Sequence, residues 1–337
     1  MSNLGNNFPD LYTSESTAQT QDLPVAATLS DVTFVHAKGV VALDHVSFSI
    51  PAGKRTCIVG ANGSGKSTVA SILSGLTAPD EGTVTFLGTT VVNDGQVDFE
   101  AYKTVRPQLG LVFQNPEDQI ICSVVADDIA FGLENLQVPS NQITPLVEQQ
   151  IELGTLTDFA SENPQMLSGG QQQRLRYALA TMHSPELLIL DEPTAGMDVN
   201  ARRTFWERME AIAERGTTIL FATHYLEEAQ NFAQRIVLME SGSIIADGSS
   251  DEIRALTGHR HLSFLAPAPI TDLDVPVEVT EESGGYRHRI SVLEIEQVLR
   301  TLLNNYSITD LEVTKPSLDE SFTLLTEQAA ASKASDA

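Results

Sequence analysis

Cysteine and long apolar runs are scarce in this chain of 337 residues. Its two cysteines, Cys57 and Cys122, lie in apolar surroundings, which is typical of buried thiols in a reducing compartment and not of a disulfide or a metal pair. No stretch of about 18 uncharged apolar residues occurs, so no segment is predicted to span a bilayer. The N-terminus also lacks the basic and then apolar layout of a secretory signal.

Positive charge is also scarce, because 20 lysines and arginines stand against 45 aspartates and glutamates, for a formal net charge of −25. The phosphates of nucleic acids and anionic lipid surfaces both repel such a chain. Solubility alone accounts for much of this charge. We therefore predict no nucleic-acid partner. If the chain acts at a membrane, we expect it to bind a protein there and not the lipid surface.

A glycine-rich segment, Gly60–Thr68, matches the phosphate-binding pattern G-x-x-x-x-G-K-S. It follows an apolar run, Thr56–Val59, and precedes a helical pattern, Ser67–Leu73, so it has the strand, loop and helix that its mechanism needs. Backbone N–H groups of such a loop surround an anion, and the helix adds its positive end. Lys66 would reach the β- and γ-phosphates, and Ser67 would hold Mg²⁺. Nucleotide contacts are predicted from Gly60, Asn62, Gly63, Ser64, Gly65, Lys66, Ser67 and Thr68.

Two further segments carry chemistry. Leu187–Glu192 is an apolar strand that ends in two carboxylates. In nucleotide hydrolysis Asp191 would support Mg²⁺, and Glu192 would orient or deprotonate the attacking water. The segment Leu167–Gln171 reads Leu-Ser-Gly-Gly-Gln, and its serine is placed to cap a helix over Gln171–Thr181. A second helix end suited to an anion is unusual in an enzyme with one site.

Together these motifs resemble the ATP-binding-cassette family, whose signature segment is Leu-Ser-Gly-Gly-Gln, and the resemblance covers roughly Leu29 to Leu256. It implies an α/β fold of the P-loop NTPase type, with a RecA-like mixed sheet core, a helical subdomain and here a small C-terminal α/β domain. It also implies that two cassettes pair head to tail. Each ATP, with Mg²⁺, would then lie between one phosphate loop and the partner's Ser168, Gly169, Gly170 and Gln171, and would be hydrolysed.

The same resemblance implies roles for three more residues. Gln114, after the strand Leu109–Phe113, matches the glutamine that touches Mg²⁺ and the water, so it joins Ser67 and Asp191 as a metal ligand. Asp198 matches the acid of the loop that crosses the dimer interface. His224, after the strand Ile219–Phe221, matches the histidine that contacts the γ-phosphate. The predicted catalytic residues are thus Glu192, His224 and Gln114.

The family also has an aromatic residue, most often tyrosine, that stacks on adenine. By alignment this position falls on His36, and a register shift of two residues would place Phe34 there. Imidazole offers less surface for stacking than phenol, so weaker base selectivity is expected.

The pattern of elements predicts four regions. Residues 1–24 are predicted as a disordered tail, 25–258 as the ATPase domain with a helical subdomain at about 115–184, 259–326 as an accessory domain, and 327–337 as a second disordered tail. The accessory domain should contain a hairpin of the strands Val275–Thr280 and Tyr286–Val292. A helix over Leu293–Leu303 and a strand over Ile308–Val313 should follow it. A capping box at Ser317 and Glu320 is expected to open a last helix to about Thr326.

Different segments of the sequence indicate different directions of transport. Gln114–Ile120 and Val125–Gly132 are similar to energy-coupling-factor and cobalt-type importer ATPases, whereas Gly196–Trp206 and Thr223–Ala229 are similar to drug-exporter ATPases. The C-terminal domain also resembles the exporter type, so an exporter is favoured slightly, with a vitamin or metal importer as the alternative. A non-transport cassette protein, or a regulator without turnover, is disfavoured.

In either direction the resemblance implies a separate transmembrane subunit, a homodimer or heterodimer of cassettes, and a peripheral position at the cytoplasmic face of the cell membrane.

Overall fold

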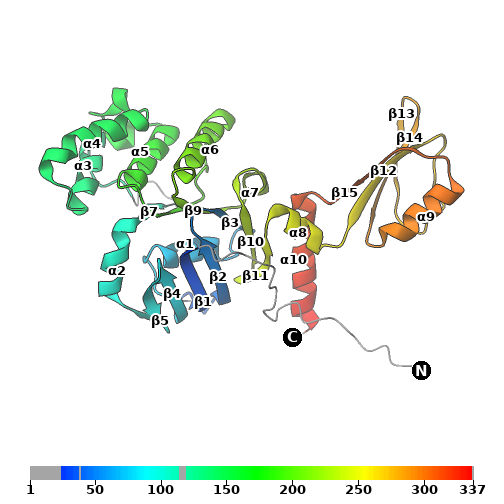
Figure 1. Cartoon of the computed structure of the whole chain (residues 1–337), viewed down its shortest axis with the longest axis horizontal. Coiled ribbons are helices and arrows are strands. Elements are labelled where there is room, and N and C mark those ends of the chain that lie inside the picture. The colour runs from blue at the N-terminus through cyan, green and yellow to red at the C-terminus, as the bar shows by residue number, and fades with distance from the viewer. Residues whose placement is uncertain (1–23, 38, 114–118, 336–337) are drawn as a thin grey trace.

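The computed structural model describes residues 24–37, 39–113 and 119–335, so nearly all of the predicted N-terminal tail lies outside the described residues. Figure 1 shows a larger part that contains two sheets and several helices, and a smaller sheet-and-helix domain that projects from it. We call these parts the cassette and the accessory domain. Among the described residues no helix has both the length and the apolar character that a membrane span requires.

A six-stranded sheet forms the centre of the cassette, in the order β11-β10-β3-β9-β8-β7. Its five parallel strands all coincide with apolar runs in the sequence, the last at Ile236–Met239, and β11 is an antiparallel edge strand. The inner strands are almost wholly buried because helices or a second sheet cover both faces, as is usual for parallel sheets. The strands are β3 (Arg55–Val59), β7 (Leu109–Val112), β8 (Leu187–Asp191), β9 (Thr218–Thr223), β10 (Arg235–Glu240) and β11 (Ser243–Gly248).

A second, antiparallel sheet packs beside the first, in the order β2-β1-β4-β5-β6. The apolar runs Val32–Val35 and Val46–Ile50 predict only parts of its first two strands. The strands are β1 (Val25–Val35), β2 (Val41–Pro51), β4 (Glu81–Phe86), β5 (Thr89–Asn93) and β6 (Gln96–Val97). Their apolar side chains, together with α1 (Lys66–Leu73) and α2 (Phe99–Val105), form one core against the six-stranded sheet.

The opposite face of the six-stranded sheet carries a second core around Trp206, which stacks on Phe232 at a centroid distance of 4.4 Å. This core is built from α6 (Val199–Ala213), α7 (Leu226–Phe232) and α8 (Ser250–Leu256), together with one face of α5 (Gly169–Thr181). The sheet therefore separates two cores and presents the carboxyl ends of its parallel strands at one edge, where α/β proteins bind ligands.

The helical subdomain lies within the predicted range of about 115–184. Helices α3 (Val125–Asn135), α4 (Ser140–Leu153) and α5 share a separate apolar core. Short 3₁₀ turns occupy Arg106–Gln108, Thr157–Phe159 and Pro164–Met166. Cys57 is buried as predicted, but Cys122, just before α3, is only half-buried.

The accessory domain is a four-stranded antiparallel sheet in the order β13-β14-β12-β15, with α9 (Ile295–Asn305) on one face. The predicted hairpin, helix and final strand are all present, as β13 (Glu278–Glu282), β14 (Gly285–Val292), α9 and β15 (Thr309–Thr314). The sequence missed β12 (Arg260–Ala266), although Leu262, Phe264 and Ala266 alternate as buried residues along it.

Helix α10 (Leu318–Ser335) begins with the predicted capping box, in which Ser317 N donates to Glu320 Oε2 at 2.7 Å. Two expectations about this region are wrong. The helix continues to Ser335, because alanines at 329–331 favour helix, so 327–335 is not irregular. It also packs on the cassette, not on the accessory sheet, because Leu318, Phe322 and Leu325 join the core around Trp206. The accessory domain therefore ends near Thr314, and α10 returns the chain to the cassette.

Candidate nucleotide-binding site

The segment Gly60–Thr68 forms the loop after β3 and the first turn of α1, at the carboxyl edge of the sheet. Gly65 has φ +103°, and a Cβ atom there would lie 2.6 Å from the Ala42 carbonyl oxygen, so only glycine fits. Ser64 N donates to Ala61 O at 3.1 Å, whereas the N–H groups of Gly63, Gly65 and Lys66 have no acceptor among the described residues. Such converging, unpartnered donors at a helix N-terminus fit the oxygens of a polyphosphate.

The Lys66 side chain is folded back over this loop. Its Nζ donates to the carbonyls of Gly60 at 2.9 Å and Ala61 at 3.1 Å, and the residue is 4% exposed. Burial lowers the pKa of Lys66, while the nearby carboxylates of Glu192 and Asp191 act in the opposite direction. The ammonium group is therefore held at the loop where a phosphate would bind.

Ser67 and Asp191 meet at the end of β8, where Ser67 Oγ donates to Asp191 Oδ1 at 3.2 Å. Burial raises the pKa of Asp191, and the Ser67 hydrogen bond works against this rise. A hydroxyl and a carboxylate side by side are the hard oxygen ligands that Mg²⁺ takes alongside substrate phosphates. The donor set thus fits the predicted ion. The third predicted ligand, Gln114, lies outside the described residues.

Glu192 and His224 form the other predicted pair at this edge. His224 Nδ1 lies 2.9 Å from Glu192 Oε2, and the Glu192 side chain is buried while His224 is partly exposed. Glu192 has φ +46°, an unusual conformation for a residue with a side chain. Its N–H donates to Ala222 O of β9 at 2.9 Å, which ties this residue to the neighbouring strand.

Sequence reasoning missed a buried carboxylate that supports this pair. Glu228 of α7 is 2% exposed and accepts hydrogen bonds from the hydroxyls of Thr194 and Thr223, the latter at 2.9 Å. Arg202 Nε lies 3.6 Å away from it and compensates its charge. Glu228 therefore joins the turn after Glu192 to the residue before His224. A glutamate in the first turn of a helix is ordinary, so the sequence carries no signal for this role.

In the signature segment Ser168 and Gly169 are exposed, Gly170 and Gln171 are half-buried and Leu167 is buried. No hydrogen bond or ion pair among the described residues joins the segment to the phosphate loop. Ser168 caps α5 as predicted, in a capping box where Ser168 N donates to Gln171 Oε1 at 2.7 Å. A Cβ atom on Gly169 or Gly170 would meet nothing within 4 Å. Packing within this chain therefore does not require glycine at either position.

Asp198 caps α6, and its Oδ1 accepts from the N–H groups of Asn200 and Ala201 at 2.9 Å each. The carboxylate is exposed near the turn that follows Glu192. This placement is compatible with the predicted interface role, which stays a prediction.

The two candidates for adenine stacking differ in exposure. Phe34 is half-buried and packs against the core, whereas His36 is exposed and meets the edge of Phe34 at 5.2 Å in a T-shaped contact. We expect His36→Ala to weaken ATP binding by about twofold to tenfold, since an aromatic contact contributes roughly 0.5–1.5 kcal/mol. Titration with a fluorescent ATP analogue measures this, with competition by GTP to report base selectivity. Unchanged affinity in His36→Ala with a loss in Phe34→Ala would move the role to Phe34.

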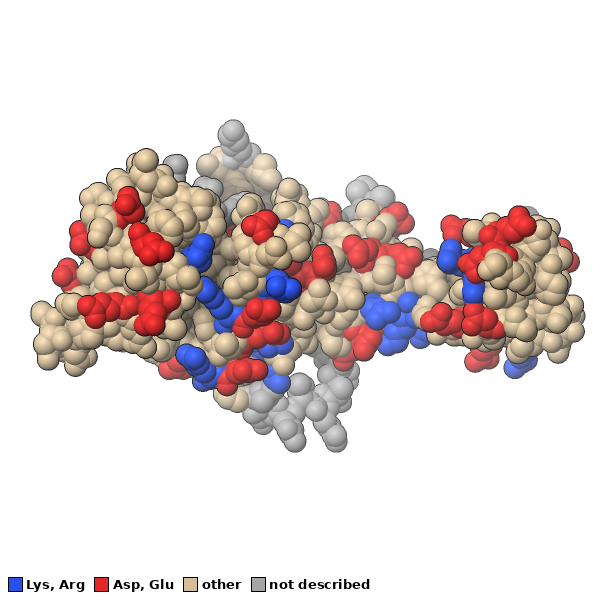
Figure 2. Space-filling view, turned by 90° about the horizontal axis from the view of Figure 1, so that it is seen from above, with Lys and Arg blue, Asp and Glu red and all other residues tan. Residues whose placement is uncertain are grey.

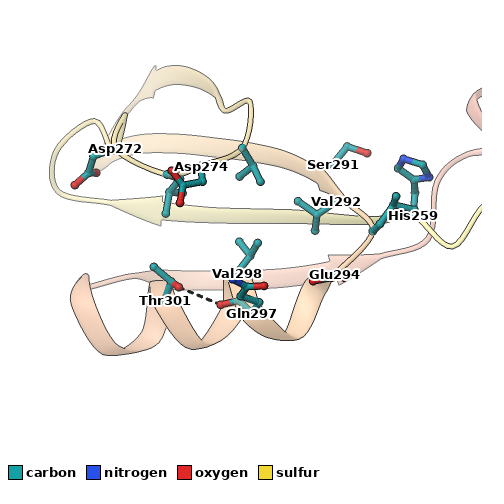
Figure 3. Close-up of a pocket in the computed structure, with 12 residues that line it drawn as sticks. His259, Asp272, Asp274, Ser291, Val292, Glu294, Gln297, Val298 and Thr301 are labelled. Atoms are coloured by element: carbon teal, nitrogen blue, oxygen red, sulfur yellow. Dashed lines mark hydrogen bonds between the residues drawn. The ribbon is translucent and has the colours of Figure 1, made fainter. Parts of the chain in front are cut away.

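A cavity lies elsewhere, in the accessory domain. It measures about 440 Å³ and opens between α9 and β14, where Val292 and Val298 point toward each other (Figure 3).

The strand order, the phosphate loop and the two carboxylates after β8 define the chain as a P-loop nucleoside triphosphatase. A family model described as ABC transporter matches residues 43–195. The energy-coupling factor transporter ATP-binding protein EcfA1 of Halalkalibacterium halodurans is 37% identical over 267 residues, which cover 79% of this chain and 92% of that protein. The chain belongs to the ATP-binding-cassette family of transporter ATPases, which confirms the predicted resemblance and fold.

Other relatives agree. A putative ABC transporter ATP-binding protein of Bifidobacterium longum is 44% identical over 218 residues, which cover 64% of this chain but only 28% of that longer protein. The structure of cbiO1 from Clostridium perfringens, part of the ABC transporter complex cbiONQ, matches with a TM-score of 0.61 at 27% identity over 69% of this chain and 91% of cbiO1. The dimeric cassette MJ0796 bound to ADP and Pi also matches with a TM-score of 0.61, at 26% identity, covering 66% of this chain and 98% of MJ0796.

Proposed function

We propose that this chain is the ATP-hydrolysing subunit of an energy-coupling-factor-type importer. Several relatives that the chain covers over most of their length are energy-coupling factor ATP-binding proteins. This supports the importer alternative better than the exporter that was slightly favoured. The two importer-like segments are Gln114–Ile120 and Val125–Gly132, and the apolar side chains of Phe131 in the second and of Ile121, directly after the first, are exposed. Exposed apolar side chains at this place suit contact with a transmembrane partner.

In the proposed reaction, different residues at one edge of the sheet bind the phosphates, hold Mg²⁺ and accept the proton. The loop N–H groups and Lys66 bind the phosphates of ATP, and Ser67 with Asp191 holds Mg²⁺, which neutralises charge on those phosphates. Glu192 accepts a proton from the attacking water. His224 orients the Glu192 carboxylate, because its Nδ1 lies 2.9 Å from Glu192 Oε2. His36 would stack on the adenine.

The observation that carries the proposal is the exposed start of the signature helix at Ser168 and Gly169. Its two glycines have open space around them, and the N–H groups of Gly169 and Gly170 have no acceptor among the described residues. A second cassette that brings its nucleotide against Ser168–Gln171 would supply that acceptor. We therefore propose a head-to-tail homodimer or heterodimer with two ATP sites, each completed by the partner's signature segment and its Asp198.

The remaining partners follow from the same proposal. Transport requires a membrane-spanning path, which we assign to a separate subunit. The chain itself would bind that subunit at the cytoplasmic face of the cell membrane. Figure 2 shows many acidic side chains over both the cassette and the accessory domain, and fewer basic side chains among them. The many acidic side chains in this view disfavour a nucleic-acid partner.

Affinity purification of the tagged chain from detergent-solubilised cells tests this function. We expect an integral membrane protein to co-purify and Mg²⁺-dependent phosphate release to accompany it. Metabolite profiles of cells that lack the chain then decide direction, because an importer defect depletes its substrate inside the cell and an exporter defect accumulates it. Association with ribosomes or DNA and no membrane partner would reject the transport role.

A further inference from the structure

The helix that begins at the signature segment also holds the residue next to Glu192. Gln173 Nε2 and Tyr177 Oη, in the second and third turns of α5, both donate to the carbonyl oxygen of Pro193, the Tyr177 bond at 2.7 Å. Gln173 Nε2 also donates to Tyr177 Oη at 2.7 Å, which closes a three-membered network. Gln173 is 2% and Tyr177 8% exposed, so water does not compete for these bonds.

The backbone at this point needs such support. Glu192 has φ +46° and directly precedes a proline, which further restricts its backbone. A strained conformation persists only where the surrounding structure holds it. Pro193 has no N–H of its own to donate, so its carbonyl is the group by which neighbouring elements can hold it. The two donors from α5 fix that carbonyl and with it the direction of the Glu192 side chain.

Helix α5 is itself held against the sheet. Arg176 Nη1 donates to Phe113 O at the end of β7 at 2.7 Å, and Tyr177 stacks on Phe205 of α6 at a centroid distance of 4.5 Å. Burial raises the pKa of the Tyr177 hydroxyl well above its usual value, so it remains a donor. The network therefore belongs to a rigid contact between α5 and the strand ends.

We propose that Gln173 and Tyr177 are positioning residues that set the geometry of Glu192 through the Pro193 carbonyl. The inference rests on the proposed function, because it requires Glu192 to be the base. The N-terminus of α5 would then complete the partner's site, while Gln173 and Tyr177 in its second and third turns hold the base of its own chain. A displacement of the signature segment would then reach Glu192 through two hydrogen bonds.

Tyr177→Phe removes one hydroxyl and keeps the ring that stacks on Phe205. We expect its kcat for ATP hydrolysis to fall about threefold to tenfold, the range for loss of one buried hydrogen bond, with KM within about twofold of the wild type. Gln173→Met combined with Tyr177→Phe leaves the Pro193 carbonyl without either donor and should lower kcat further. Tyr102→Phe, which removes a partly buried hydroxyl 3.5 Å from Leu73 O, is the matched control and should leave kcat unchanged.

A double-mutant cycle separates positioning from general loss of structure. Once Glu192→Gln has removed the carboxylate, nothing remains to be positioned, so Tyr177→Phe should not lower the residual single-turnover rate any further. An equal loss in both backgrounds, or a rise in KM without a change in kcat, would overturn the inference. If Glu192→Gln itself hydrolyses ATP normally, the proposed base is wrong, which is a different failure.

Discussion

Replacement of Glu192 by glutamine is expected to lower the rate of ATP hydrolysis by about 10²–10⁴-fold, the range for loss of a general base. The substitution keeps the size of the side chain and its place beside His224, but the amide accepts no proton. Neither the loop N–H groups nor Lys66 is altered, so ATP binding should stay within about threefold of the wild type. Phosphate release and equilibrium binding measure the two effects separately.

The same variant should accumulate a nucleotide-bound dimer, because the phosphates that join the two cassettes are no longer cleaved. Size-exclusion chromatography with light scattering in MgATP would show it, and chelation of Mg²⁺ with removal of nucleotide should return the monomer. Glu100→Gln, an exposed glutamate on α2, makes the same change in charge and should behave as the wild type. Normal turnover in Glu192→Gln would reject Glu192 as the base, and a monomer in MgATP would reject the shared site.

The features that the sequence predicted correctly depend on near neighbours along the chain. The phosphate loop needs only the strand before it and the helix after it, and Ser168 caps the helix that begins one residue later. Asp191 and Glu192 end an apolar strand, and parallel strands bring their carboxyl ends to one edge of the sheet. The meeting of Ser67 with Asp191 follows from that geometry, although they are far apart in sequence.

Features that depend on contacts between distant elements could not be predicted in this way. Gln173 and Tyr177 look like ordinary members of a helix until Pro193 is placed against them. β4 was missed because its alternating pattern is limited to Val84 and Phe86, and only pairing with β1 defines it as a strand. The capping box predicted where α10 begins. It could not predict that α10 packs on the cassette, because that depends on contacts of its apolar side chains with the distant core around Trp206.

Lys66→Met is expected to weaken ATP binding by about 10²-fold, because charge-assisted hydrogen bonds contribute roughly 1.5–3 kcal/mol each. The Lys66 stem is buried, and methionine fills much of the same space, so the loop should keep its shape. The ammonium group now bonds to the Gly60 and Ala61 carbonyls, and it must turn toward the phosphates when ATP binds. Its loss removes the only side-chain cation that contacts this loop within the described chain.

Lys66→Arg should fail to restore binding, since a planar guanidinium does not fit a site that is only 4% exposed and shaped around a single ammonium group. Lys103→Ala, an exposed lysine on α2, removes the same charge and is the matched control. Calorimetric titration with ATP in the presence of Mg²⁺ measures all three variants, and their melting temperatures check the fold. If Lys66→Met bound ATP as tightly as the wild type, the loop N–H groups alone would hold the phosphates. The lysine would then act only on charge that develops during hydrolysis, and its defect would appear in kcat.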